Sequence, residues 1–226
     1  MSTSTSPGQY KAKQSWQSPE KAAAYRVSRD PSQFTRYDRE EKIIKEWLVG
    51  LPAQALVLDV PCGTGRFIPL LISKGFRYTG ADFSRAMIQE AKQTAGERPT
   101  VGFTNADVEF LPFRSQAVDC VIIWRFLHHI GNAATRQAIL REAARVARHK
   151  VLVSFHHPIS FTHWRKLVQQ AVLGGEPRGH AVSHWQLQKE GEAAGLRLIE
   201  TKGFRKYVSV NWFAYFEKSG RAPATS

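Results

Sequence analysis

The stretch LVLDVPCGTGRF, from Leu56 to Phe67, decides the fold of this chain. A short apolar run ends in an acid, Asp59, and the turn that follows contains Gly63 and Gly65. Turns of this kind usually hold a nucleotide, because glycine lets the backbone approach the ligand and the next helix presents its N-terminus. The question is which nucleotide fits beside a carboxylate.

The turn does not match the two common phosphate-binding motifs. A dinucleotide fingerprint needs a third glycine where this sequence has Ile68, and a phosphate loop needs a Gly-Lys-Ser/Thr ending that is absent. Asp59 stands at the carboxyl end of its strand, where parallel α/β sheets bind their ligands. A carboxylate there opposes a pyrophosphate but suits a cation. S-adenosylmethionine offers an ammonium and a sulfonium and has no phosphate.

Two further acids strengthen this interpretation. Asp82 ends the next predicted strand, where a carboxylate suits the two hydroxyl donors of a ribose. Asp107 follows the third strand, where it can accept a hydrogen bond from an adenine amino group while the Val108 N–H faces a ring nitrogen. The order of the three acids matches amino acid, ribose and base.

Outward from this motif, apolar strands alternate with helical patterns. We expect helices over 66–75, 84–95 and 132–148, the second capped by Ser84. Strands are expected at 55–60, 76–82, 100–107, 117–124, 150–155, 195–204 and 207–218. This alternation predicts an α/β, doubly wound, mostly parallel seven-stranded sheet with an antiparallel edge strand and helices on both faces.

The domain organisation follows from composition and breaks in the pattern. We expect a disordered tail at 1–18, an N-terminal helical cap at 19–50 interrupted near Pro31, one catalytic domain at 51–218 and a tail at 219–226. A polar, His-rich helical insertion at about 156–194 is predicted to form a lid over an acceptor pocket.

The chain is basic, with 32 Lys and Arg against 19 Asp and Glu and a formal charge of +13. Anionic partners are therefore plausible, and so is a merely solvated basic surface. Two cysteines do not make a disulfide framework, and neither a secretory signal nor a run long enough to cross a bilayer is visible. We expect a cytoplasmic protein without a transmembrane segment, for which peripheral membrane contact stays open.

Five stretches carry a resemblance to a known family: LDVPCGTGR, GADFSRAMIQEAK, ADVEFLPF, AVDCVIIWRFLHHI and ILREAARVARHKVLVSF. In these the chain resembles the class I, Rossmann-like S-adenosylmethionine-dependent methyltransferases, in particular the small-molecule branch similar to ubiquinone and menaquinone biosynthesis methyltransferases. The likeness runs from Leu56 to Ser154 and more loosely to Lys218. One departure is Pro61 in place of the first family glycine, which removes an N–H but keeps a carbonyl acceptor.

The resemblance implies S-adenosyl-L-methionine as cofactor, S-adenosyl-L-homocysteine as product, and methyl transfer to a hydroxyl or similar nucleophile of a small, anionic or lipid-like acceptor. The cofactor-binding residues would be Asp59, Pro61, Cys62, Gly63, Gly65, Asp82, Phe83, Asp107, Val108 and Trp124.

Catalysis for a hydroxyl acceptor needs a base, and His128 and His129 are the candidates, although one of them can instead only orient its loop. Candidate substrate-binding residues are Tyr25, Arg26, Tyr37, His156, His157 and Arg165. The histidines of the insertion lack neighbouring cysteines and acids, so no metal site is expected.

Two other functions stay open. The basic charge suits an RNA methyltransferase, whose binding would weaken steeply with salt, whereas DNA is not expected as a partner. A non-catalytic adaptor with a methyltransferase fold would bind the cofactor weakly.

Overall fold

The computed structural model of the chain describes residues 18–27, 34–159, 179–203 and 210–219. Nearly all of the two predicted tails lies outside the described residues, and so do residues 160–178 of the predicted lid.

The described chain alternates strands and helices as the sequence predicts. The helices are α2 (Pro19–Val27), α3 (Phe34–Leu48), α4 (Ile68–Ser73), α5 (Arg85–Ala95), the short 3-10 helix η2 (Leu127–His129), α6 (Ala133–Val146) and α8 (His184–Glu192). The strands are β1 (Leu56–Asp59), β2 (Arg77–Asp82), β3 (Gly102–Asn105), β4 (Val118–Ile123), β5 (Ala147–His156), β6 (Leu196–Gly203) and β7 (Asn211–Lys218).

The strands form one seven-stranded sheet in the order β3-β2-β1-β4-β5-β7-β6. The first five strands of this order pair in parallel, from β3 to β5. β7 pairs antiparallel with both β5 and β6. The predicted doubly wound, mostly parallel sheet is confirmed, and the expected antiparallel strand lies one position inside the edge, which β6 forms.

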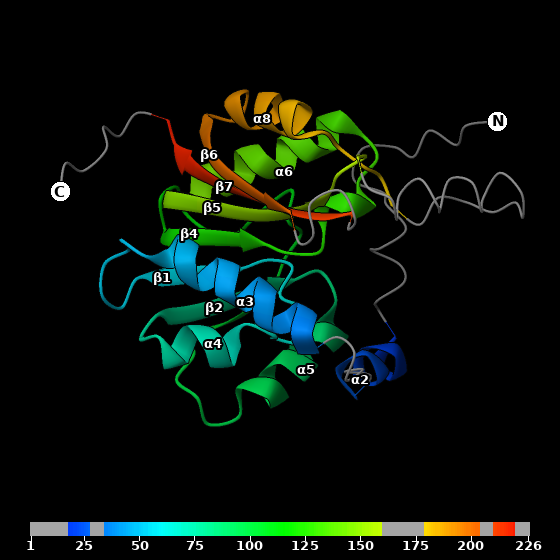
Figure 1. The fold of residues 1–226 in the computed structure, drawn as a ribbon. Helices are drawn as coiled ribbons and strands as arrows, with labels where there is room; N and C mark the ends of the chain where they lie inside the picture. Colours follow the sequence, from blue (N-terminus) through cyan, green and yellow to red (C-terminus); the bar gives the residue numbers. More distant parts are fainter. Residues whose placement is uncertain (1–17, 28–33, 160–178, 204–209, 220–226) are drawn as a thin grey trace, which may run out of the picture.

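Helices cover both faces of the sheet (Figure 1). On one face, Ile44 and Trp47 of α3 and Leu71 of α4 pack against Val57 and Ile122 of the central strands. α6 and α8 cover the other face and lie against each other and against β5 and β6 respectively. Because helices cover both faces of the sheet, β4 is buried at every position, as is expected of a central parallel strand.

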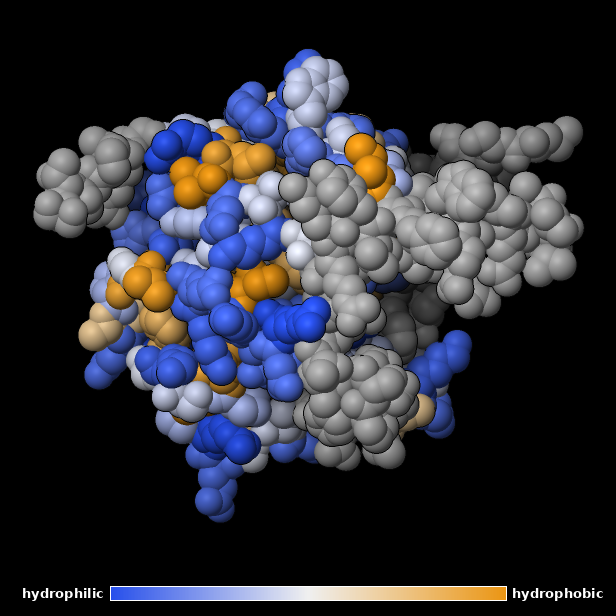
Figure 2. Space-filling model, in the orientation of Figure 1, coloured by the Kyte–Doolittle hydropathy of each residue, from blue (hydrophilic) through white to orange (hydrophobic). Residues whose placement is uncertain are grey.

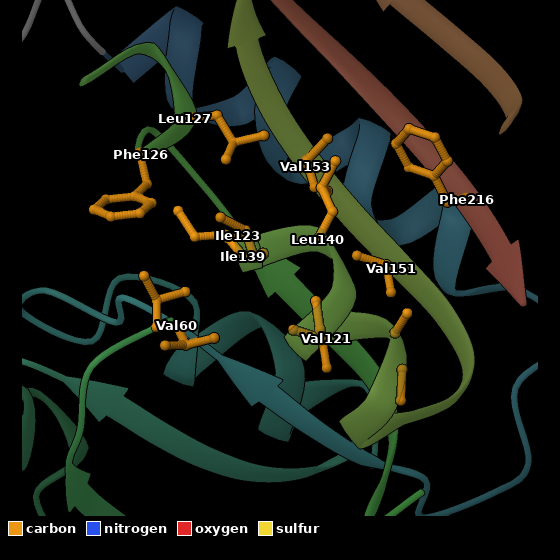
Figure 3. Packing of buried hydrophobic residues seen from close by; sticks show 14 of the residues in the cluster. Val60, Val121, Ile123, Phe126, Leu127, Ile139, Leu140, Val151, Val153 and Phe216 are labelled. Atoms are coloured by element: carbon orange, nitrogen blue, oxygen red, sulfur yellow. The ribbon is translucent and has the colours of Figure 1, made fainter. Parts of the chain in front are cut away.

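The core under α6 shows how β4 and β5 are fixed (Figure 3). Val121 and Ile123 of β4 and Val151 of β5 pack with Ile139 and Leu140 of α6. Alternate residues of β4, Cys120 and Ile122, belong to the cluster on the opposite face. This packing holds the carboxyl end of β4 in a fixed place next to the end of β1.

The outer surface is mainly hydrophilic on the face shown in Figure 2, with hydrophobic residues in small separate patches. Among the described residues, no helix combines the length and the apolar composition that crossing a bilayer requires.

Candidate active site

The Gly-rich turn connects β1 to α4 and opens a pocket of about 350 Å³ at the carboxyl ends of the strands. This volume is typical of small-molecule sites. The two glycines of the turn have different tasks. Gly63 lines the pocket at φ +52°, and a Cβ there would meet no atom within 4 Å. Gly65, at φ +74°, is not among the lining residues, and its Cβ would lie 2.4 Å from Ile68 and 3.2 Å from Ala91. Gly63 therefore keeps the pocket open, whereas Gly65 lets the turn pack against α5.

Asp59 lies on the floor of the pocket and is almost completely buried. The hydroxyl of Tyr78 donates a hydrogen bond to its Oδ2 atom at 3.2 Å. Burial raises the pKa of the Asp59 carboxyl to about 8; Tyr78 and Arg66 lower this pKa, and the charge of Asp82 raises it further. Burial thus favours the protonated form of Asp59 in the ligand-free protein, and a cation bound beside it would favour the ionised form.

Asp82 ends β2 and ties two loops of the pocket together. Its Oδ2 atom accepts the Gly63 N–H at 2.9 Å and its Oδ1 atom accepts the Ser84 N–H at 2.8 Å. Burial raises the pKa of Asp82 to about 6, and these backbone hydrogen bonds oppose the shift. The Ser84 hydroxyl accepts the Met87 N–H at 3.2 Å, which confirms the predicted cap of α5.

The third predicted acid, Asp107, follows β3 in a turn of its own. Asp107 is not among the lining residues, and its Oδ1 atom accepts the Glu109 N–H at 3.1 Å inside its own turn. The adjacent Val108 is buried and lines the pocket together with Ala106. This loop therefore offers an apolar wall to a ligand. The other predicted cofactor residues that line the pocket are Pro61, Cys62, Phe83 and Trp124.

A polar cluster joins the cap to the sheet, and the sequence analysis missed its central members. Glu40 of α3 is fully buried and accepts hydrogen bonds from Arg66 at 2.5 Å and from the indole of Trp124 at 3.0 Å. The Arg66 guanidinium also lies 4.2 Å from the centre of the Tyr37 ring. Arg66 directly follows the glycine turn, and that position was the one signal available for it.

The side of the pocket next to β4 carries basic groups. Arg125, His128 and His129 line it, and they follow β4 directly. The His128 ring lies between two others, with its centre 4.1 Å from that of His129 and 4.0 Å from that of His156. Burial lowers the pKa of His129, and the nearby Arg125 and His180 lower it further.

The remaining candidates for substrate binding separate into three groups. Tyr25 of α2 and Tyr37 of α3 line the pocket. His157 is buried and is not among the lining residues of the pocket. Its Nε2 atom lies 3.2 Å from the Nδ1 atom of His184, and its ring centre lies 4.7 Å from that of Trp212. The Arg26 side chain and Arg165 lie outside the described residues. Among the described residues, no group of three or more His, Cys, Asp and Glu side chains has an arrangement that holds a metal.

Further lining residues that the sequence analysis did not name are Thr64, Phe67, Met87 and Phe126. They are apolar or weakly polar and complete the wall between the acids of β1 and β2 and the basic groups after β4.

Comparison with known proteins agrees with this architecture. Residues 57–150 match the methyltransferase domain family. The chain is 31% identical over 105 residues to the tRNA (carboxymethyluridine(34)-5-O)-methyltransferase of Xenopus tropicalis, which covers 46% of this chain and 16% of that protein. It is 32% identical over 119 residues to the demethylmenaquinone methyltransferase of Tropheryma whipplei, covering 50% and 47% of the two chains. The chain thus spans less than half the length of either relative.

A solved structure resembles the whole fold. The magnesium protoporphyrin IX methyltransferase of Synechocystis PCC 6803, crystallised with S-adenosylhomocysteine, superimposes with a TM-score of 0.73 at 21% identity, over 92% of this chain and 98% of that one. Three findings point to the same kind of protein. They are the strand order of the sheet, the acids at the ends of β1 and β2, and the family match over residues 57–150. The chain therefore contains a segment that matches the methyltransferase domain family, set in a fold like that of the magnesium protoporphyrin IX methyltransferase.

Proposed function

We propose that this chain binds S-adenosylmethionine in the pocket described above and transfers its methyl group to a hydroxyl or similar nucleophile of a small, anionic or lipid-like acceptor. The observation that carries the proposal is the pair of buried acids, Asp59 and Asp82, at adjacent strand ends beside the open backbone of Gly63. A bound cation favours the ionised form of these buried carboxyls and is then attracted to it, whereas a phosphate disfavours that form.

The residues around Gly63 supply a partner for each part of the cofactor. Asp59 would bind the ammonium group, because that contact favours the ionised form of a carboxyl that burial keeps neutral. Asp82 would bind the ribose hydroxyls, since a carboxylate with two oxygens can accept more than its two backbone hydrogen bonds. Arg66 would pair with the carboxylate, and Ala106 and Val108 would face the adenine.

The bound cofactor supplies a methyl group on a positively charged sulfur, which is already a good leaving group. The chain must then align the acceptor with this methyl group and, for a hydroxyl, remove a proton. His128 and His129 line the pocket and follow β4, whereas the two acids end β1 and β2. The lowered pKa of His129 keeps its imidazole neutral at pH 7, as a general base requires.

The test is calorimetric titration with S-adenosylhomocysteine, followed by assays of methyl uptake from S-adenosylmethionine by quinols, phenols and RNA. Wild type should bind the ligand, and Asp59→Asn should bind it at least tenfold more weakly, because about 1.4 kcal/mol of charge interaction is lost. The exposed residue Glu97 provides the matched control, Glu97→Gln, which should bind like wild type. Absence of binding by the wild-type protein would contradict the proposal.

RNA is the second candidate acceptor, for two reasons. The chain carries a formal charge of +13, and one of its relatives is a tRNA methyltransferase by name. RNA binding releases counterions, so its affinity would fall steeply between low and physiological salt. A small acceptor would show a shallow salt dependence, and measuring KM at two salt concentrations distinguishes the two candidates.

A further inference from the structure

The charged groups that line the pocket come from different strand ends, and one cation, Arg66, follows the same turn as Gly63. Of the described residues that line the pocket, the two carboxylates, Asp59 and Asp82, lie at the ends of β1 and β2. Arg125, His128 and His129 lie after the end of β4. A cofactor held by the two carboxylates would leave the basic groups after β4 facing whatever enters next to it.

We propose that Arg125, supported by His128, forms an anion-binding subsite that recognises a carboxylate or phosphate group of the methyl acceptor. This inference rests on the proposed function, because it assumes that Asp59 and Asp82 hold the cofactor. It gives Arg125 a role in binding the acceptor and gives the acceptor an anionic group.

The backbone of Arg125 is fixed in a costly conformation that aims this residue at the pocket. Its φ is +55°, in the left-handed region that non-glycine residues seldom adopt. The Arg125 N–H donates a hydrogen bond to the Ser154 hydroxyl of β5 at 2.5 Å. Conformations of this kind persist where the surroundings hold them, and they concentrate at functional sites.

The guanidinium of Arg125 brings a positive charge to the pocket, where it donates a hydrogen bond to Tyr37 and lies near Glu40. Glu40 also accepts hydrogen bonds from Arg66 and Trp124, so this carboxylate does not serve Arg125 alone. Burial opposes the charge of Arg125, but Tyr25, Glu40 and Tyr37 outweigh burial and raise its pKa.

The positive charge of Arg125 also acts on a neighbouring histidine, His129. The pKa of His129 is lowered by burial first and then by the charges of Arg125 and His180. The His128 ring lies between those of His129 and His156, with ring centres 4.1 Å and 4.0 Å away. An anion placed beside Arg125 would accept a charge-assisted hydrogen bond from its guanidinium, with the His128 ring next to it in the pocket lining.

The experiment uses the protein saturated with S-adenosylhomocysteine and compares three probes of similar size: benzoate, phenyl phosphate and the neutral benzyl alcohol. Wild type should bind benzoate or phenyl phosphate at least about tenfold more tightly than benzyl alcohol, as expected for a hydrogen bond between charged groups. The stronger of the two anions identifies the group that the acceptor carries.

Arg125→Gln should abolish this preference, and Arg125→Lys should keep most of it because the charge remains. The matched control is Arg77→Gln, an exposed arginine at the start of β2, which should retain the preference. Thermal unfolding of each variant shows whether it is folded.

Three results would overturn the inference: equal binding of the anionic and neutral probes by wild type, no detectable anion binding at millimolar concentration, or an unchanged preference in Arg125→Gln. A fourth is a loss of S-adenosylhomocysteine affinity in Arg125→Gln as large as the loss of anion affinity, since Arg125 would then serve the cofactor carboxylate. Failure of wild type to bind S-adenosylhomocysteine contradicts the proposed function instead, so the two failures are distinguishable.

Discussion

The Asp82 carboxylate accepts the Gly63 N–H at 2.9 Å and so links the end of β2 to the glycine turn after β1. The two residues are 19 positions apart in the chain and come together because β1 and β2 pair in parallel. One side chain thereby shapes the turn and faces the pocket that the turn encloses.

Replacing Asp82 by Ala should weaken binding of S-adenosylhomocysteine by about 1–3 kcal/mol, because hydrogen bonds to a charged group are lost and the turn is released. Calorimetric titration measures the change. Asp107→Ala serves as the comparison and should have a smaller effect, since Asp107 lies outside the set of lining residues. Equal losses of affinity in the two variants would show that Asp107 also contacts the ligand. An unchanged affinity of Asp82→Ala would exclude the assigned pocket.

Binding of the cofactor should release protons from Asp59. The pKa of this carboxyl is about 8 in the ligand-free protein, so below pH 8 it is mainly protonated. A bound ammonium needs the carboxylate, and the proton must leave. Calorimetry at pH 7 in buffers of different ionisation enthalpy should therefore detect release of up to about one proton per site from Asp59. Asp59→Asn should lack this release. Identical proton release by wild type and variant would show that Asp59 is already ionised.

The same carboxyl should make the stability of the ligand-free protein depend on pH. The folded pKa of about 8 lies above the unfolded value of about 3.9, so the folded state holds the proton more tightly. The contribution of Asp59 to stability is complete below about pH 4 and is lost as the pH rises to about 8. Asp59→Asn should remove this loss, so thermal melts at pH 5 and pH 8 should differ less for the variant than for wild type. A larger difference in the variant would contradict the assignment.

The two glycines of the turn should respond differently to alanine. Gly65→Ala should destabilise the fold by more than the left-handed strain of about 1–2 kcal/mol, because its Cβ would lie 2.4 Å from the Ile68 Cδ1 atom, which must shift, and 3.2 Å from the Cα atom of Ala91. Gly63→Ala meets open space, so the strain alone applies, but the methyl group enters the pocket. Gly63→Ala should therefore lose more ligand affinity, and Gly65→Ala more thermal stability. Melting temperatures and titrations of both variants test this contrast, and the reverse order would refute it.

Prediction from the sequence succeeded where chemistry and chain order act locally. The strand, the turn and Asp59 are contiguous, and Ser84 caps α5 within one helical turn. Asp59 and Asp82 were predicted to stand at strand ends, and both line one pocket because β1 and β2 are parallel neighbours. Alternating helices and strands were enough to predict the architecture.

Prediction of the site was less complete where the direction of a side chain, or packing between distant segments, decides which residues come into contact. His156 and His157 were proposed together, yet successive residues at the end of a strand point to opposite faces, so His156 contacts His128 while His157 contacts His184. Gly65 was assigned to the cofactor, but its neighbours are atoms of α4 and α5.

The sequence by itself determined the order of strands and helices, the acids at the strand ends and the likeness to methyltransferases, because these depend on local pattern and on chain direction. The tertiary structure alone decided that Glu40 meets Arg66 and Trp124, which are 26 and 84 residues away. It also decided which basic groups face the pocket after β4. Such contacts depend on how α3 packs against the sheet and on which strands pair within it, and no local pattern encodes the meeting of side chains so far apart in the chain.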